Sequence, residues 1–300
     1  MPRAMATGHV PGPLQHGSTD DFLLDGVSSR YVPNYLTGSR LGTGATITLK
    51  PSSPGFTDAA TPAYVVDFFF ENSEATPEPN AQYNSMATNL NIVIGSGNVG
   101  AVGIRLRGAQ GSGIEDVTVF AGDGLAGVVG GCGSGGAHHG LRVVGGRYGL
   151  DLRQSQPTGT VSGSTLEGQR CAGLVYGGFE SLSAVGMNIT DQRGCFAAVS
   201  TDVTGAGGNT TYYLPGAPRD ECSLPLMPTG PGFPSDYQQS NPGIAAKMSF
   251  IDSSIDFAPR SSGRCPASLG GVSAFRAVRS LFLQVSSVSS TLRSCGLQRL

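Results

Sequence analysis

Three side chains that could carry out acid–base chemistry lie close together in the middle of the sequence. Asp116, His138 and Arg142 belong to two successive apolar stretches of a repeating pattern. A shift of one repeat pairs Thr118 with Arg142 and Ile114 with His138, so Asp116 is expected to lie diagonally near both. A carboxylate, an imidazole and a guanidinium on one outer surface could transfer protons and bind a uronate. The alternative is a solvated surface with an ordinary Asp–Arg pair.

A second group of charged residues is dominated by arginine. Arg105, Arg107, Asp151 and Arg153 occupy alternate positions in two other apolar stretches, and we expect them to point outward on one surface. Because guanidinium groups bind carboxylates through paired hydrogen bonds, this stripe predicts contact with an acidic glycan. The alternative is a charged surface that only discourages edge pairing. We favour this stripe over the first patch as the glycan contact.

The remaining candidates are scattered, and no complete catalytic pair stands out. Asp123 is either a catalytic carboxylate or a turn-forming residue. Glycosidases need two carboxyl groups about 5 Å or about 6.5–9.5 Å apart, and no two acids lie one repeat apart in a secure register. The catalytic candidates are therefore Asp116, His138, Asp123 and Asp151, the substrate-binding candidates are Arg105, Arg107, Arg142 and Arg153, and the weaker candidates are His139, Glu167, Arg147 and Tyr176.

The elements that position these residues are short alternating stretches bounded by glycine. Alternation of apolar and polar residues between glycines predicts strands rather than helices. One series of apolar residues contains Ile92, Val117 and Leu141, and a second contains Ile104, Val128, Leu150 and Leu174. Two or three strands in each repeat of about 23 residues predict a solenoid, a parallel β-helix with a side-chain-filled interior.

The same region resembles a known family. The residues in question are 89–98 (NLNIVIGSGN), 100–105 (GAVGIR), 111–118 (GSGIEDVT) and 145–150 (GGRYGL). They resemble the pectate-lyase-like superfamily and, more narrowly, its rhamnogalacturonase/epimerase-type domain, well over 85–190 and loosely over 25–290. The resemblance implies an all-β, right-handed parallel β-helix that acts on polysaccharides. We expect a glycoside hydrolase acting on pectin-like or other plant or algal cell-wall glycans. The alternatives are a non-catalytic glycan-binding or adhesive β-helix, or a polysaccharide lyase.

The ends of the sequence depart from the family pattern. Residues 1–19 form an irregular segment without the capping segment of the family, which predicts an incomplete start or a partner covering the first edge. Residues 20–300 are expected to form a single β-helix domain, with a Pro- and Gly-rich loop inserted at about 205–243. The strand pattern resumes at 248–257 and is expected to continue at 281–285.

Composition excludes several classes of protein. Charged residues make up only 13% of the chain and the net charge is −2, so we expect no nucleic-acid partner. No apolar run reaches the roughly 20 residues needed to span a bilayer. The segment 1–17 lacks the apolar core of a signal peptide, whereas the family resemblance implies secretion. No acidic cluster is dense enough for Ca²⁺, and no metal or cofactor is predicted.

The cysteines leave one question open. Cys171 and Cys195 are one repeat apart, which would place them at a spacing that a disulfide tolerates. The alternative is a ladder of buried thiols, which we favour. The absence of any Cys-x-x-Cys motif gives no support for a zinc site.

Overall fold

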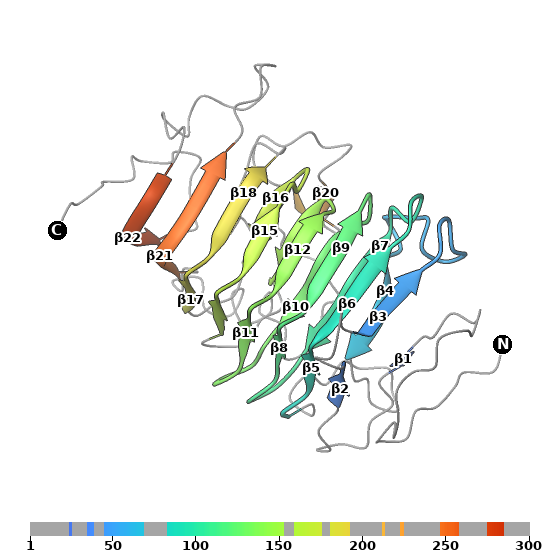
Figure 1. Cartoon of the computed structure of the whole chain (residues 1–300), viewed down its shortest axis with the longest axis horizontal. Helices are drawn as coiled ribbons and strands as arrows, with labels where there is room; N and C mark the ends of the chain where they lie inside the picture. Colours follow the sequence, from blue (N-terminus) through green and yellow to red (C-terminus); the bar gives the residue numbers. More distant parts are fainter. Residues whose placement is uncertain are drawn as a thin grey trace.

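The computed structural model describes residues 24–25, 35–38, 45–68, 83–152, 159–175, 181–192, 212–213, 223–224, 247–257 and 275–284. Within these residues every regular element is a β-strand and there is no helix. The strands lie side by side as a long ladder between β3 and β21 (Figure 1). The all-β prediction is therefore confirmed for the described part of the chain.

The strands from β1 to β18 fall into three rows, because each strand from β1 to β15 pairs in parallel with the third strand after it. This arrangement is consistent with a parallel β-helix. Row 1 contains β2 (Tyr35–Thr37), β5 (Met86–Thr88), β8 (Gly113–Glu115), β11 (Ala137–His139), β14 (Thr160–Ser162) and β17 (Ser181–Val185). Row 2 contains β3 (Ala45–Leu49), β6 (Leu90–Ile94), β9 (Thr118–Gly122), β12 (Arg142–Gly145), β15 (Thr165–Glu167) and β18 (Asn188–Gln192). Row 3 contains β1 (Leu24–Asp25), β4 (Ala63–Phe68), β7 (Ala101–Arg107), β10 (Ala126–Gly131), β13 (Tyr148–Asp151) and β16 (Ala172–Val175).

The register confirms most of the predicted repeat. In row 3 the predicted series of Ile104, Val128, Leu150 and Leu174 are successive Cα partners. The first interval of row 2 differs from the prediction, because Ile92 pairs with Val119 and not with Val117. The segment that joins β6 to β9 is longer than the segments that join the later strands of row 2 up to β18. The alternation of residues within a strand does not reveal such a difference in register.

The interior of the ladder is apolar and is filled from all three rows. Side chains from successive strands form columns, such as Val119, Val143 and Leu166 in row 2, and all are fully buried. One inward position of row 3 is occupied by glycine in successive strands. Valine side chains of row 2 fill the space that a larger residue would need there. A Cβ atom on Gly127 would lie 2.4 Å from Cγ1 of Val143, and one on Gly103 would lie 2.6 Å from Cγ1 of Val119. The glycines that introduce these row 3 repeats therefore make room for row 2.

A second, separate apolar cluster covers the outer side of row 3. Its members include Val102, Ala126, Tyr148 and Ala172, which are successive register partners and are all buried. Row 3 thus buries both of its faces, as near-continuous apolar strands do. This burial matters for the predicted arginine stripe, because the stripe lies on the same outer face.

The ladder resumes in β21 (Lys247–Phe257), as predicted. This long strand pairs in parallel with β17 through its first half and with β18 through its second half. The expected continuation near 281–285 is different: β22 (Phe275–Gln284) pairs antiparallel to β21. Within the predicted insertion, β19 (Tyr212–Tyr213) and β20 (Ser223–Leu224) form a short antiparallel pair, which corrects the expectation of a loop without regular strands. The insertion's boundaries stay a prediction.

Candidate functional site

Three central repeats carry a continuous outer surface across rows 1 and 2. Their outward and corner positions stack in register, so that each repeat contributes one residue to each of four columns. We call these positions the central grid. The columns are Glu115, His139 and Ser162; Asp116, Gly140 and Gly163; Thr118, Arg142 and Thr165; and Phe120, Val144 and Glu167.

The corner between rows 1 and 2 is built from residues with left-handed backbone. Asp116 has φ 52°, Gly140 has φ 61° and Gly163 has φ 57°. Each corner amide donates to the carbonyl that precedes the next corner: Asp116 to His139 O at 2.9 Å and Gly140 to Ser162 O at 2.9 Å. Aspartate and glycine tolerate this conformation better than other residues do. The Asp116 carboxylate therefore sits on a fixed corner, beside bare glycine backbone.

His138 is not on the outer surface, which contradicts the prediction. Its ring is fully buried between its register partners Ile114 and Val161, and neither ring nitrogen has a hydrogen-bond partner. Burial lowers the pKa of His138 to about 4. The prediction carried strand alternation through Gly140, whereas the left-handed corner there reverses which side chains point inward.

His139 supplies the exposed imidazole instead. Its Nδ1 lies 2.9 Å from Oγ of Ser162 in the next repeat, and its other register partner is Glu115. A Cβ on Gly163 would lie 3.6 Å from Cε1 of His139, so the ring lies above this glycine corner. The acid and the imidazole of this surface are therefore Asp116 and His139, on adjacent columns, and not the predicted pair of Asp116 and His138.

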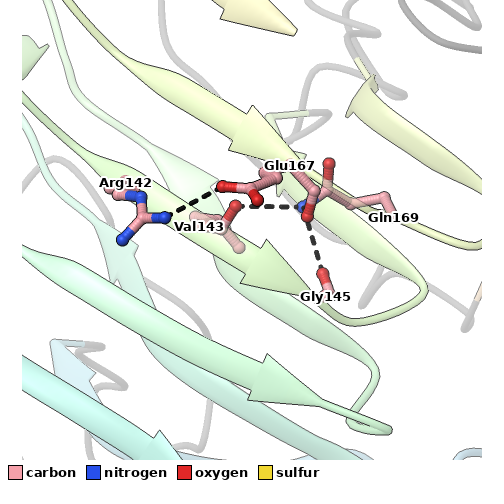
Figure 2. Close-up of polar contacts among 5 residues, drawn as sticks. All are labelled: Arg142, Val143, Gly145, Glu167 and Gln169. Carbon is pink, nitrogen blue, oxygen red and sulfur yellow. Dashed lines mark hydrogen bonds and ion pairs between the residues drawn. The ribbon is translucent and has the colours of Figure 1, made fainter. Parts of the chain in front are cut away.

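The outer face of row 2 is largely polar and carries one exposed aromatic ring. Phe120 is 39% exposed, and its register partners Val93 and Val144 are partly exposed. Nη2 of Arg142 donates to Oε2 of Glu167 at 2.9 Å across this surface (Figure 2). Arg142 thus points outward as predicted. Phe120 was missed, although its position after Val117 and Val119 already marked it as an outward aromatic.

The buried amide of Gln169 holds the end of the same strand. Its Nε2 donates to the carbonyls of Glu167, Val143 and Gly145 at 2.9, 3.2 and 3.1 Å (Figure 2). Two of these carbonyls belong to β12, the preceding strand of row 2. Gln169 therefore ties two repeats together just beyond Glu167, which fixes the edge of the central grid.

The arginine stripe is not an open surface. Arg107 and Asp151 are buried, and Arg105 is paired with Asp67 through Nε at 2.6 Å and through a second contact from Nη2. The Arg105 guanidinium also lies 4.0 Å from the centroid of the Tyr64 ring. These residues face outward from row 3 as predicted, but that face is largely buried. Arg153 and Tyr176 lie outside the described residues.

Asp123 acts as a brace between repeats. Its Oδ2 accepts a hydrogen bond from the Gly97 amide at 2.8 Å, and its backbone carbonyl accepts one from Nη2 of Arg170 at 2.8 Å. These contacts fit the turn-forming alternative. Arg147, another of the weaker candidates, lies in the turn before β13, where its carbonyl accepts hydrogen bonds from two amides of the next repeat.

The cysteines partly answer the question left open by the sequence. Cys171 is disulfide-bonded, which corrects the preference for free thiols at this position. Cys132 is a buried thiol, and burial raises its pKa to about 11. The remaining cysteines, Cys195 among them, lie outside the described residues.

Comparison with known proteins adds no assignment. The sequence matches no protein family, and no curated protein is found as a relative. The likeness to the pectate-lyase-like superfamily therefore stays a prediction. In the part of the chain that the structure describes, no group of three His, Cys, Asp or Glu side chains could hold a metal ion. That part also contains no helix long and apolar enough to cross a membrane.

Proposed function

We propose that this chain is a right-handed parallel β-helix that acts on an extended polysaccharide bound across the central grid. The parallel three-row ladder supports the fold, since parallel crossover connections are right-handed in nearly all proteins. The observation that carries the function is the exposed Phe120 ring in the same row of stacked strands as the outward-facing Arg142 and Glu167. A polymer suits such a surface because it can cross several repeats, whereas a small ligand needs a pocket.

The proposed chemistry is glycoside hydrolysis at the corner of the grid. Asp116 and Glu115 are neighbouring carboxylates there, and His139 lies one repeat away. In an inverting reaction one carboxylic acid protonates the leaving glycosidic oxygen, and the other carboxylate removes a proton from the attacking water. The water oxygen bonds to the anomeric carbon as the glycosidic bond breaks. Asp116 is our candidate for one of these roles, as in the sequence prediction.

The competing proposal is a non-catalytic glycan-binding β-helix. The ion pair of Arg142 with Glu167 favours this version, because a carboxylate that is bound to a guanidinium is a poor proton donor. Secretion is proposed for either version. The Cys171 disulfide supports it, since disulfides persist mainly in oxidising compartments.

The test combines binding with product analysis. The wild-type chain is mixed with pectin, rhamnogalacturonan and β-glucan, and reducing ends and absorbance of unsaturated products are followed. Hydrolysis predicts new reducing ends without unsaturation, and Asp116→Asn should lower the rate by about 100-fold or more. Binding without product would establish the non-catalytic version. An unsaturated product would establish a lyase, and no binding to any polysaccharide would overturn the proposal.

A further inference from the structure

We infer that the glycan bound by the central grid is uncharged, an inference that rests on the proposed function and narrows its substrate class. The sequence predicted an acidic glycan because arginines were expected to line an open face. Arg105 and Arg107 instead lie on the buried outer side of row 3. The charge that a uronate polymer would meet must therefore be assessed at the grid.

Two basic side chains in and beside the grid are already engaged. Arg142 is paired with Glu167 in the grid. Arg170 donates through Nη2 to the carbonyls of Asp123 and Gly124, and through Nη1 to that of Gly122. A uronate carboxylate at the grid would therefore compete with Glu167 for Arg142, whose charge that carboxylate already offsets.

The acidic residues around the grid add negative charge to this surface. Glu115 and Asp116 lie at its corner. The grid residues themselves carry three carboxylates, those of Glu115, Asp116 and Glu167, against the one guanidinium of Arg142. A polyuronate would be repelled from it, most strongly at low ionic strength.

The uncharged groups of row 2 suit a neutral sugar chain. Val93, Phe120 and Val144 form an apolar strip of register partners. Beside the strip runs a polar column in which Asn91, Thr118, Arg142, Thr165 and Asn188 are successive partners. A pyranose ring has an apolar face of C–H groups and a rim of hydroxyls. The strip can pack against the face while amide and hydroxyl groups of the column pair with the rim.

The experiment measures binding of the full chain to hydroxyethyl cellulose, linear galactan and polygalacturonate at two salt concentrations. We expect binding to at least one neutral polymer, with an affinity that changes less than about twofold between about 0.05 and 0.5 M salt. Phe120→Ala should weaken this binding about fivefold to tenfold. Tyr35→Ala is the matched control, because Tyr35 is an exposed aromatic of row 1 in the first repeats.

A second variant tests the charge argument by a gain of binding. Glu167→Gln removes the partner of Arg142, so affinity for polygalacturonate at low salt should rise severalfold. This result does not depend on how Phe120→Ala folds. Binding of wild-type chain to polygalacturonate alone, weakened by salt and unchanged in Phe120→Ala, would overturn the uncharged glycan and leave the proposed function standing. Failure to bind all three polymers would remove both.

Discussion

The carboxylate of Asp116 lies directly over Gly140 of the next repeat. A Cβ atom on Gly140 would be 2.4 Å from Oδ1 of Asp116, and the backbone at Gly140 already has φ 61°. The two residues are one repeat apart in sequence and adjacent in space. The Asp116 carboxylate, the candidate acid of the site, therefore occupies space that is open because Gly140 has no side chain.

Gly140→Ala should destabilise the fold for two reasons, the left-handed backbone and the collision with Asp116. Gly135→Ala is the matched control, because Gly135 has φ 69° but no atom within 4 Å of the place that a Cβ would take. The control should lose about 1 kcal/mol of unfolding free energy in denaturant titrations, and Gly140→Ala at least about 1 kcal/mol more. Equal losses would show that the Asp116 carboxylate rotates away at little cost and is not held at this corner.

A double-mutant cycle can test the packing of Gly127 under Val143. Gly127→Ala introduces a Cβ that would lie 2.4 Å from Cγ1 of Val143, and Val143→Ala removes that atom. We expect the two changes to couple. The double variant should lose less unfolding free energy than the sum of the losses in the two single variants, by about 1 kcal/mol or more. The measurement is urea unfolding of all four proteins. Additive losses would mean that the two rows do not meet here.

Much of this interior was predictable because glycine and apolar residues recur at regular spacing. The columns through Val119 and Val143, and through Ile104 and Val128, follow from that spacing. The direction of His138 did not follow. A single left-handed residue at Gly140 reverses the alternation, and neither glycine nor aspartate in a sequence reveals by itself that its φ is positive.

The buried His138 predicts a loss of stability in acid. Burial holds its folded-state pKa near 4, below the value of 6.5 for an exposed histidine. Its contribution is therefore complete above about pH 6.5 and is lost as the pH falls toward 4, by about 3 kcal/mol in total. His138→Leu should reduce this loss between pH 6.5 and 4 in thermal or denaturant unfolding. His139→Gln, which changes an exposed imidazole, should retain it, and an unchanged pH dependence in His138→Leu would contradict the assignment.

Arg105 should stabilise the fold instead of binding glycan. Its side chain and that of Asp67 are only 17% and 13% exposed, and the pair is reinforced by the Tyr64 ring. Arg105→Ala should therefore cost about 2–3 kcal/mol of unfolding free energy, since it takes the guanidinium away from a largely buried carboxylate. Asp67→Ala added to this variant should cost little more. A stable Arg105→Ala protein that has lost glycan binding would instead support the prediction that the arginine stripe binds glycan.

The Arg142–Glu167 pair should behave in the opposite way. Both side chains are about half or somewhat less exposed, so water screens their attraction. Arg142→Ala should change the unfolding free energy by less than about 1 kcal/mol, as measured by urea titration. A loss above about 2 kcal/mol would show that the pair holds the fold together and is not a surface feature available to a ligand.

The site was harder to predict than the fold, because outward direction does not ensure exposure. Arg107 and Asp151 point away from the interior as alternation predicts, yet both are buried. A warning was present in the sequence: Val102 and Tyr148 place apolar side chains on the same outer side of row 3. The outer face of row 2 carries only the short apolar strip of Val93, Phe120 and Val144, of which Phe120 is the most exposed.

The most direct test of the glycan-binding surface is a crystal structure of the chain with a bound neutral oligosaccharide of about six sugars. The account predicts a sugar ring packed against Phe120, with the chain crossing β9 and β12 and a glycosidic bond near Asp116. Density for the oligosaccharide on the outer side of row 3, or anywhere that leaves Phe120 uncovered, would contradict it.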